Sequence, residues 1–116
     1  LESIIAEIDQ YIAGVSLINT IPAKVFDKNG KQALPGKGRL SSGLVGAGIK
    51  WAGLDMVKRM DDLRHSYGYQ YQIVGVGGVV KPEHFFEYRE AGADLVQACT
   101  GPMWNPNLAH EIAQHF

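Results

Sequence analysis

Apolar side chains recur with the period of an α-helix in two segments of the chain. Residues 1–13 carry one stripe with acidic residues opposite, which predicts an amphipathic helix that ends near Gly14, a residue suited to cap a helix. Residues 49–65 show the same period and predict a second helix. The apolar positions are Ile4, Ile5, Ile8, Tyr11 and Ile12 in the first stripe, and Ile49, Met56, Val57, Met60 and Leu63 in the second.

Three shorter apolar runs have the length and composition of buried strands, at 15–18, 73–76 and 94–98. After the second run, Pro82 suits the first turn of a helix and Glu83 its positive dipole end, and Gly92 is expected to end this helix. Asn105 and Pro106 have the pattern of an N-cap followed by proline at the first helical position. They predict a final helix that runs to the end of the chain.

Strands that alternate with helices indicate parallel βαβ units, so the fold class is α/β. The predicted order gives about three parallel βα units preceded by one helix, less than half of a (β/α)₈ barrel of roughly 250 residues. The alternative is a small three-stranded layer complete in itself, with exposed strand edges. Because the chain starts with Leu1 and a helical pattern begins at once, we interpret residues 1–116 as one partial domain of a longer protein.

A long connection separates the first strand from the second helix. Asn29 and Gly30 form a strong two-residue hairpin signal, which predicts a small excursion within this connection. Residues 35–48 contain five glycines, and the simplest interpretation of that richness is flexibility.

Glycines gather where two of the predicted strands end. The central strand ends in Gly75, Gly77 and Gly78, and the last strand ends in a second turn that contains Gly101. Residues without side chains at the carboxyl end of a strand let the backbone approach a ligand, and in α/β folds this position holds phosphates with backbone N–H groups. Alternatively, the glycines only permit a tight turn. Two such turns on neighbouring strands favour a phosphate cradle.

The amino-acid composition limits which binding partners and which cellular compartment are expected for the protein. The formal net charge is −1 and no basic run is present, which argues against nucleic acid as the main partner. Cys99 is the single cysteine, so a disulfide framework is excluded and a reducing, cytoplasmic location is expected. No apolar stretch approaches the roughly 18 residues that a membrane span needs. The four histidines are scattered, and no metal site is expected.

Four collinear stretches resemble one known family, the FMN-dependent dihydroorotate dehydrogenases, which are TIM (β/α)₈ barrels. Residues 17–20, Leu-Ile-Asn-Thr, are similar to the family's Asn-Thr pair after its sixth strand, and residues 43–50 to its Gly-Leu-Ser-Gly-Pro-Ala-Ile-Lys stretch. Residues 73–79 are similar to its Ile-Ile-Gly-Val-Gly-Gly segment, and residues 91–100 to its Ala-Gly-Ala-Ser-Leu-Val-Gln-Leu-Tyr-Thr. The resemblance implies the C-terminal part of the barrel.

The resemblance also implies roles for particular residues. The FMN phosphate and ribityl tail would lie against the backbone of five residues, namely Gly46, Gly77, Gly78, Cys99 and Thr100. Asn19 and Thr20 would bind a pyrimidine substrate, with the Asn amide as both donor and acceptor. The implied reaction is oxidation of dihydroorotate to orotate in pyrimidine biosynthesis, with a hydride passing to the flavin.

Departures from the family pattern limit what this chain is expected to do alone. Val45 replaces a serine, Ala47 and Gly48 replace Pro-Ala, and Cys99 replaces a tyrosine. The family's catalytic base belongs to an earlier part of the barrel, so no catalytic residue is expected here and the isolated chain should be inactive. The competing hypothesis is a non-catalytic half-barrel that binds a phosphorylated ligand or self-associates. The open barrel edges and an uncovered apolar face favour a homo-oligomer or association with the missing N-terminal half of the barrel. A third candidate is another phosphate-binding barrel without flavin.

Two side chains near the glycine turns are ambiguous in the sequence. Lys50 either pairs with the bound phosphate or is exposed, and Trp104 either stacks on a ligand or covers the end of the barrel. Asp61 and Asp62 are adjacent, so they cannot share one helix face, which argues against a paired-carboxylate acid–base site.

Overall fold

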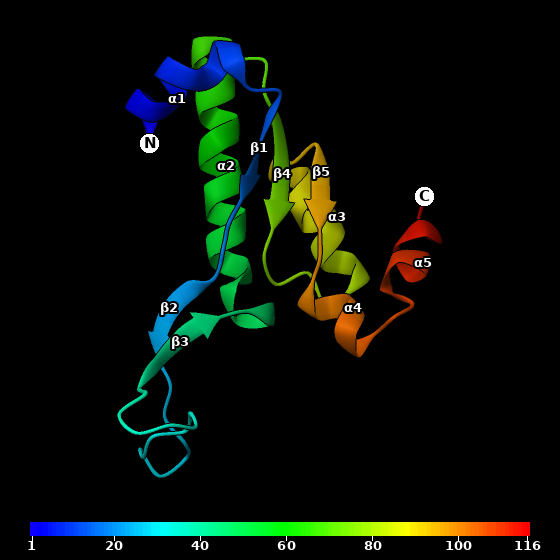
Figure 1. The fold of residues 1–116 in the computed structure, drawn as a ribbon. Helices are drawn as coiled ribbons and strands as arrows, with labels where there is room; N and C mark the ends of the chain where they lie inside the picture. Colours follow the sequence, from blue (N-terminus) through cyan, green and yellow to red (C-terminus); the bar gives the residue numbers. More distant parts are fainter.

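Three parallel strands form the central sheet of the computed structural model, which describes residues 1–116 (Figure 1). Their spatial order is β1-β4-β5, and Val15 pairs with Ile73 while Val74 pairs with Leu95. The bounds are Gly14–Leu17 for β1, Gln72–Val76 for β4 and Leu95–Gln97 for β5. The fold class is therefore the predicted one, a parallel α/β arrangement that corresponds to part of a (β/α)₈ barrel.

Two crossover helices cover one face of this sheet. Helix α2 (Lys50–Tyr67) connects β1 to β4, and α3 (Pro82–Glu90) connects β4 to β5. Strand side chains on that face, with Ile5 of helix α1 (Glu2–Ile8), pack against the two helices. The buried cluster consists of Ile5, Val57, Met60, Tyr71, Ile73, Val79, Tyr88 and Ala93. The predicted stripe of residues 49–65 therefore faces the core, as its period required.

The boundaries of the first and last helices differ from the prediction. Helix α1 ends at Ile8, a 3₁₀ turn η1 continues over Asp9–Tyr11, and Gly14 begins β1 instead of capping a helix. Gly14 lies so close to the neighbouring strand that a Cβ there would be 2.9 Å from the Gln72 carbonyl oxygen. Packing between strands, which the helical period does not reveal, explains this glycine.

At the carboxyl-terminal end, an extra helix α4 (Thr100–Trp104) follows β5, and the final helix α5 spans Leu108–Ala113. The Asn105 side chain accepts a hydrogen bond from the Asn107 N–H at 3.1 Å, so it stabilises the turn before α5. The final helix consequently begins later than Asn105 and Pro106 predicted.

The connection after β1 forms a separate antiparallel ribbon. Strand β2 (Ile21–Lys24) pairs with β3 (Ser41–Leu44), and the ribbon projects away from the central sheet in Figure 1. At its tip, the Asp27 carboxylate accepts hydrogen bonds from the N–H groups of Asn29 and Lys31, both at 2.8 Å. The predicted excursion around Asn29 is confirmed. The glycine-rich segment, however, contains β3 and the 3₁₀ helix η2 (Gly46–Ile49) instead of a structureless linker.

At the amino end of the sheet, Arg64 joins α2 to both strands that follow it. Its guanidinium contacts Asp61 at 2.6 Å and Asp94 at 2.5 Å, and donates to the Tyr71 and Gly92 carbonyls at 3.3 and 3.2 Å. The Asp94 carboxylate also accepts the Ile73 N–H at 2.7 Å. We refer to Asp61, Arg64 and Asp94 as the amino-end cluster.

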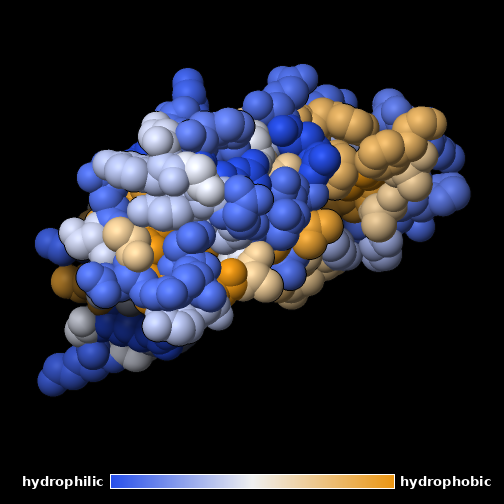
Figure 2. Space-filling model, turned by 90° about the horizontal axis from the view of Figure 1, so that it is seen from above, coloured by the Kyte–Doolittle hydropathy of each residue, from blue (hydrophilic) through white to orange (hydrophobic).

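Apolar surface remains open at Leu95 of β5, which is 61% exposed, and beside α5. A groove of about 360 Å³ runs between α3, β5 and α5, and nine of its ten lining residues are hydrophobic. Figure 2 shows hydrophobic side chains gathered at the end of the molecule where α5 lies in Figure 1. None of the helices combines the length and the apolar character needed to cross a lipid bilayer.

Candidate functional site

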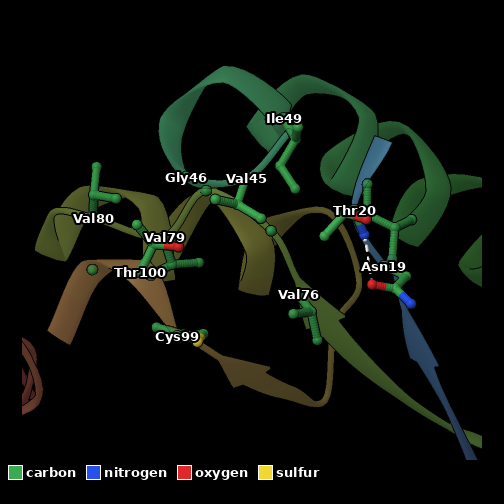
Figure 3. Close-up of a pocket in the computed structure, with 15 residues that line it drawn as sticks. Asn19, Thr20, Val45, Gly46, Ile49, Val76, Val79, Val80, Cys99 and Thr100 are labelled. Carbon is green, nitrogen blue, oxygen red and sulfur yellow. Dashed lines mark hydrogen bonds between the residues drawn. The ribbon is translucent and has the colours of Figure 1, made fainter. Parts of the chain in front are cut away.

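The carboxyl ends of all three parallel strands meet the start of η2 around one pocket of about 230 Å³ (Figure 3). Each strand contributes the loop that follows it, because parallel strands end at the same edge of a sheet. All seven residues selected from the sequence line this pocket, namely Asn19, Thr20, Gly46, Gly77, Gly78, Cys99 and Thr100. Segments up to 80 residues apart in the chain, such as 19–20 and 99–100, are thereby brought together.

The backbone after β4 adopts conformations that only glycine tolerates readily. Gly77 has φ of +123° and Gly78 has φ of +71°. Gly78 also packs tightly: a Cβ there would lie 2.7 Å from Lys50 Cβ, 2.8 Å from Lys50 N and 2.9 Å from the Gly46 carbonyl oxygen. The loop after β4 and the start of α2 are thus in direct contact, and no side chain fits between them.

Backbone donors in this pocket lack partners within the protein. The N–H groups of Gly77, Gly78 and Cys99 donate no hydrogen bond to any protein acceptor. Backbone N–H groups are obligatory donors that seek a partner, and several of them around one cavity suit an anion. The pocket therefore offers hydrogen-bond donors without offering a cationic side chain.

Asn19 and Thr20 stand at the opposite side of the pocket from Cys99 and Thr100 in Figure 3. The Thr20 N–H donates to Asn19 Oδ1 at 2.7 Å, which holds the amide in place and leaves its NH₂ group available. Thr20 also packs on Gly43 of β3, where a Cβ would lie 2.5 Å from Thr20 Oγ1. The ribbon thus supports this pair from behind.

The two ambiguous side chains have definite positions. Lys50 Nζ forms an ion pair with Glu87 at 2.5 Å, so it is neither free in solvent nor among the residues that line the pocket. Trp104 is 86% exposed at the end of α4 and does not line the pocket either. Of the two adjacent aspartates, Asp61 belongs to the amino-end cluster, whereas Asp62 is exposed.

Helix α3 supports the loop of residues 77–80 after β4, which we call the glycine loop, with side chains that were not selected from the sequence. His84 Nδ1 lies 3.2 Å from the Val80 nitrogen, whose N–H it accepts, and 3.0 Å from the Gly78 carbonyl oxygen. One turn later, the Tyr88 hydroxyl donates to the Gly77 carbonyl oxygen at 2.7 Å. Burial, together with the neighbouring Glu87 carboxylate, raises the pKa of Tyr88 to about 12. These residues read as ordinary helix surface in the sequence, and only their i, i+4 spacing points to a shared face.

Comparison with known proteins identifies this arrangement. A model of the family described as dihydroorotate dehydrogenase matches residues 2–116. The chain belongs to the dihydroorotate dehydrogenase family. The resemblance inferred from four short stretches is therefore confirmed over almost the whole chain.

Three curated relatives place the chain within that family. It is 39% identical over 98 residues to a dihydroorotate dehydrogenase of Dictyostelium discoideum, covering 84% of this chain and 26% of the relative. It is 34% identical over 100 residues to a dihydroorotate dehydrogenase B (NAD(+)) catalytic subunit of Thermodesulfovibrio yellowstonii, covering 86% and 31%. It is 36% identical over 109 residues to a dihydroorotate dehydrogenase (quinone) of Prochlorococcus marinus, covering 90% and 26%. The chain thus spans less than a third of the length of these relatives.

Proposed function

We propose that this chain is the C-terminal part of an FMN-dependent dihydroorotate dehydrogenase and that its pocket holds the FMN phosphate. The single observation that carries the proposal is the set of unpartnered N–H groups of Gly77, Gly78 and Cys99 around one cavity. A phosphate presents three strong acceptor oxygens, which match such donors.

The shape of the pocket, like its hydrogen-bond donors, suits a phosphate ester. Gly78 approaches Lys50 and Gly46 so closely that even a methyl group would overlap them. Gly77 and Gly78 also line the pocket and carry no side chains, so the loop presents bare backbone there, as close approach to a phosphate requires. Thr100, next to Cys99, adds a hydroxyl to the same wall.

In this proposal Asn19 and Thr20 contact the pyrimidine substrate. The Asn19 amide, fixed through its Oδ1 by the Thr20 N–H, keeps its two N–H donors for a carbonyl of the ring. When bound, FMN supplies the hydride acceptor for oxidation of the dihydropyrimidine. The residues of this chain position the two molecules, and the base that removes the second proton belongs to another part of the enzyme.

The open surfaces of the chain require a cover. Strands β1 and β5 each have an unpaired edge, and the β5 residue Leu95 is 61% exposed. We propose that the remainder of the barrel covers these edges. Self-association is the second candidate, which the exposed Leu95 and the apolar groove beside α5 favour.

FMN binding by the 116-residue chain tests the proposal. We expect FMN to bind with quenching of its fluorescence, and Gly77→Val to weaken binding about 100-fold, because a β-branched residue at φ of +123° is strained by roughly 1–3 kcal/mol and displaces the donors. The chain alone is expected to show no dihydroorotate oxidation.

Gly36→Val is the matched control, because Gly36 has φ of +99°, lies in the connection between β2 and β3, and has no atom within 4 Å of its Cβ position. It should leave FMN affinity unchanged. Equal loss of binding in both variants, or no FMN binding by the wild-type chain, would contradict the proposed site.

A further inference from the structure

Tyr88 is fully buried beneath the glycine loop and forms a hydrogen bond to it through its hydroxyl. The hydroxyl donates to the Gly77 carbonyl oxygen at 2.7 Å and lies 3.3 Å from the Val76 carbonyl oxygen. Two glycines make room for the ring: a Cβ at Gly53 in α2 or at Gly75 in β4 would overlap Tyr88. Three elements therefore fix the position of one hydroxyl group.

The geometry of the peptide bond links the position of the Tyr88 hydroxyl to the direction of a backbone N–H group. In a planar trans peptide the C=O of one residue and the N–H of the next point in opposite directions. The Gly77–Gly78 peptide is trans, and its carbonyl faces Tyr88 on the core side. The Gly78 N–H consequently faces the other side of the loop, where Gly78 lines the pocket and Tyr88 does not.

The preceding peptide has the same orientation but a second support. The Val76 carbonyl oxygen accepts the Ile18 N–H at 3.1 Å in addition to its contact with Tyr88. The Gly77 carbonyl oxygen has no hydrogen-bond donor other than Tyr88. Removal of the hydroxyl would thus free the Gly77–Gly78 peptide while the Val76–Gly77 peptide stays attached to Ile18.

We propose that Tyr88 is a positioning residue for anion binding, whose hydroxyl fixes the Gly77–Gly78 peptide so that the Gly78 N–H is aimed at a phosphate group. This inference rests on the proposed function, in which that phosphate belongs to FMN. Tyr88 never touches the ligand, because it is fully buried. Its effect is confined to the phosphate end of the ligand, since only the backbone donor of Gly78 depends on it.

The test compares FMN with riboflavin, which has the same ring and ribityl chain but no phosphate. Binding of both to the 116-residue chain is measured by fluorescence quenching for the wild type, Tyr88→Phe and Tyr71→Phe. Tyr71 is the matched control, because it is 1% exposed and its hydroxyl donates to the Met60 carbonyl at 2.8 Å, away from the pocket.

We expect Tyr88→Phe to weaken FMN binding about tenfold, as the loss of one hydrogen bond to a charged group does, and to change riboflavin binding by less than about twofold. Tyr71→Phe should change neither affinity. Both variants lose one buried hydroxyl group, so both should lower the melting temperature by a similar amount of roughly 4 °C. A merely structural role for Tyr88 would instead weaken both ligands equally.

A second readout uses inorganic phosphate as the probe and the Gly78 amide signal in NMR spectra. Phosphate should shift this signal in the wild type and in Tyr71→Phe but not in Tyr88→Phe. A Tyr88→Phe chain that keeps its preference for FMN over riboflavin would overturn the inference and leave the proposed function intact. A wild-type chain that binds the two flavins equally would overturn the proposed function and this inference with it.

Discussion

Polar groups at the two ends of the central sheet differ in whether they have hydrogen-bond partners within the protein. At the amino end, the Arg64 guanidinium lies between two carboxylates and two carbonyls, and the Asp94 carboxylate also accepts the Ile73 N–H. At the carboxyl end, by contrast, the N–H groups of Gly77 and Gly78 lack any protein partner. One end uses side chains that satisfy one another, and the other presents bare backbone.

This contrast separates stability from binding within one small chain. Burial alone would raise the pKa of Asp94, but the Ile73 N–H and the Arg64 guanidinium outweigh it and lower that pKa. The charged form of Asp94 therefore stabilises the fold, while the glycine loop contributes unsatisfied donors that a ligand can use. Parallel α/β folds place their binding sites at the carboxyl ends of the strands, and the same division applies here.

Gly78→Ala should have the largest effect on FMN affinity, because it changes the loop at the carboxyl end of the sheet directly. A methyl group at φ of +71°, 2.8 Å from Lys50 N, displaces the loop, and we expect FMN affinity to fall by about 100-fold or more. Fluorescence quenching measures this loss.

Gly68→Ala controls for backbone strain, because Gly68 has the same φ of +71° at the end of α2 but has open space around it. It should reduce stability by about 1 kcal/mol and leave FMN affinity intact. If Gly68→Ala also abolished binding, the two ends would be coupled and the contrast would fail.

Asp94→Asn should reduce the free energy of unfolding by about 2 kcal/mol, because it removes the charge that pairs with Arg64 while the amide oxygen still accepts the Ile73 N–H. Urea denaturation measures the change, and FMN affinity per folded molecule should remain constant. The Asp94 side chain is 29% exposed, so the effect is smaller than for a fully buried pair.

Asp94→Asn should also make the free energy of unfolding depend less on pH at acidic pH. The pKa of Asp94 in the folded chain lies below its ordinary value of 3.8, so its stabilisation is complete above that value and is lost as the pH falls through the folded-state pKa. Wild-type stability should therefore drop more steeply below pH 3.8 than that of Asp94→Asn. Parallel curves for the two proteins would exclude Asp94 as the responsible group.

Lys50→Met should have the smallest effect and tests whether backbone alone binds the phosphate. Lys50 is engaged by Glu87, whose side chain is 40% exposed, so solvent screens the pair and its loss should cost less than about 1 kcal/mol. FMN affinity should change by less than about twofold. A tenfold loss in calorimetry would show that a cationic side chain takes part in binding.

Local patterns predicted the strands of the sheet and which residues line the pocket, since each rests on short-range signals. The apolar stripe of residues 49–65 is visible in the sequence as a helical period, and the glycines after β4 mark the end of a strand. Both have the predicted positions. The pairing of β2 with β3 was missed because 16 residues separate Lys24 from Ser41. Tyr88 was not selected from the sequence, because its hydroxyl meets its acceptor only when α3 packs over β4.

The antiparallel ribbon has a consequence for how such chains change over time. Lys24 and Ser41 are paired across the two strands of the ribbon. The connecting segment 25–40 therefore begins and ends at the same place in the structure. Insertions or deletions within 25–40 can therefore alter the outline of the molecule without moving Thr20 or the glycine loop. A change of length in this connection would therefore vary the surroundings of the pocket while the residues that line the pocket stay in place.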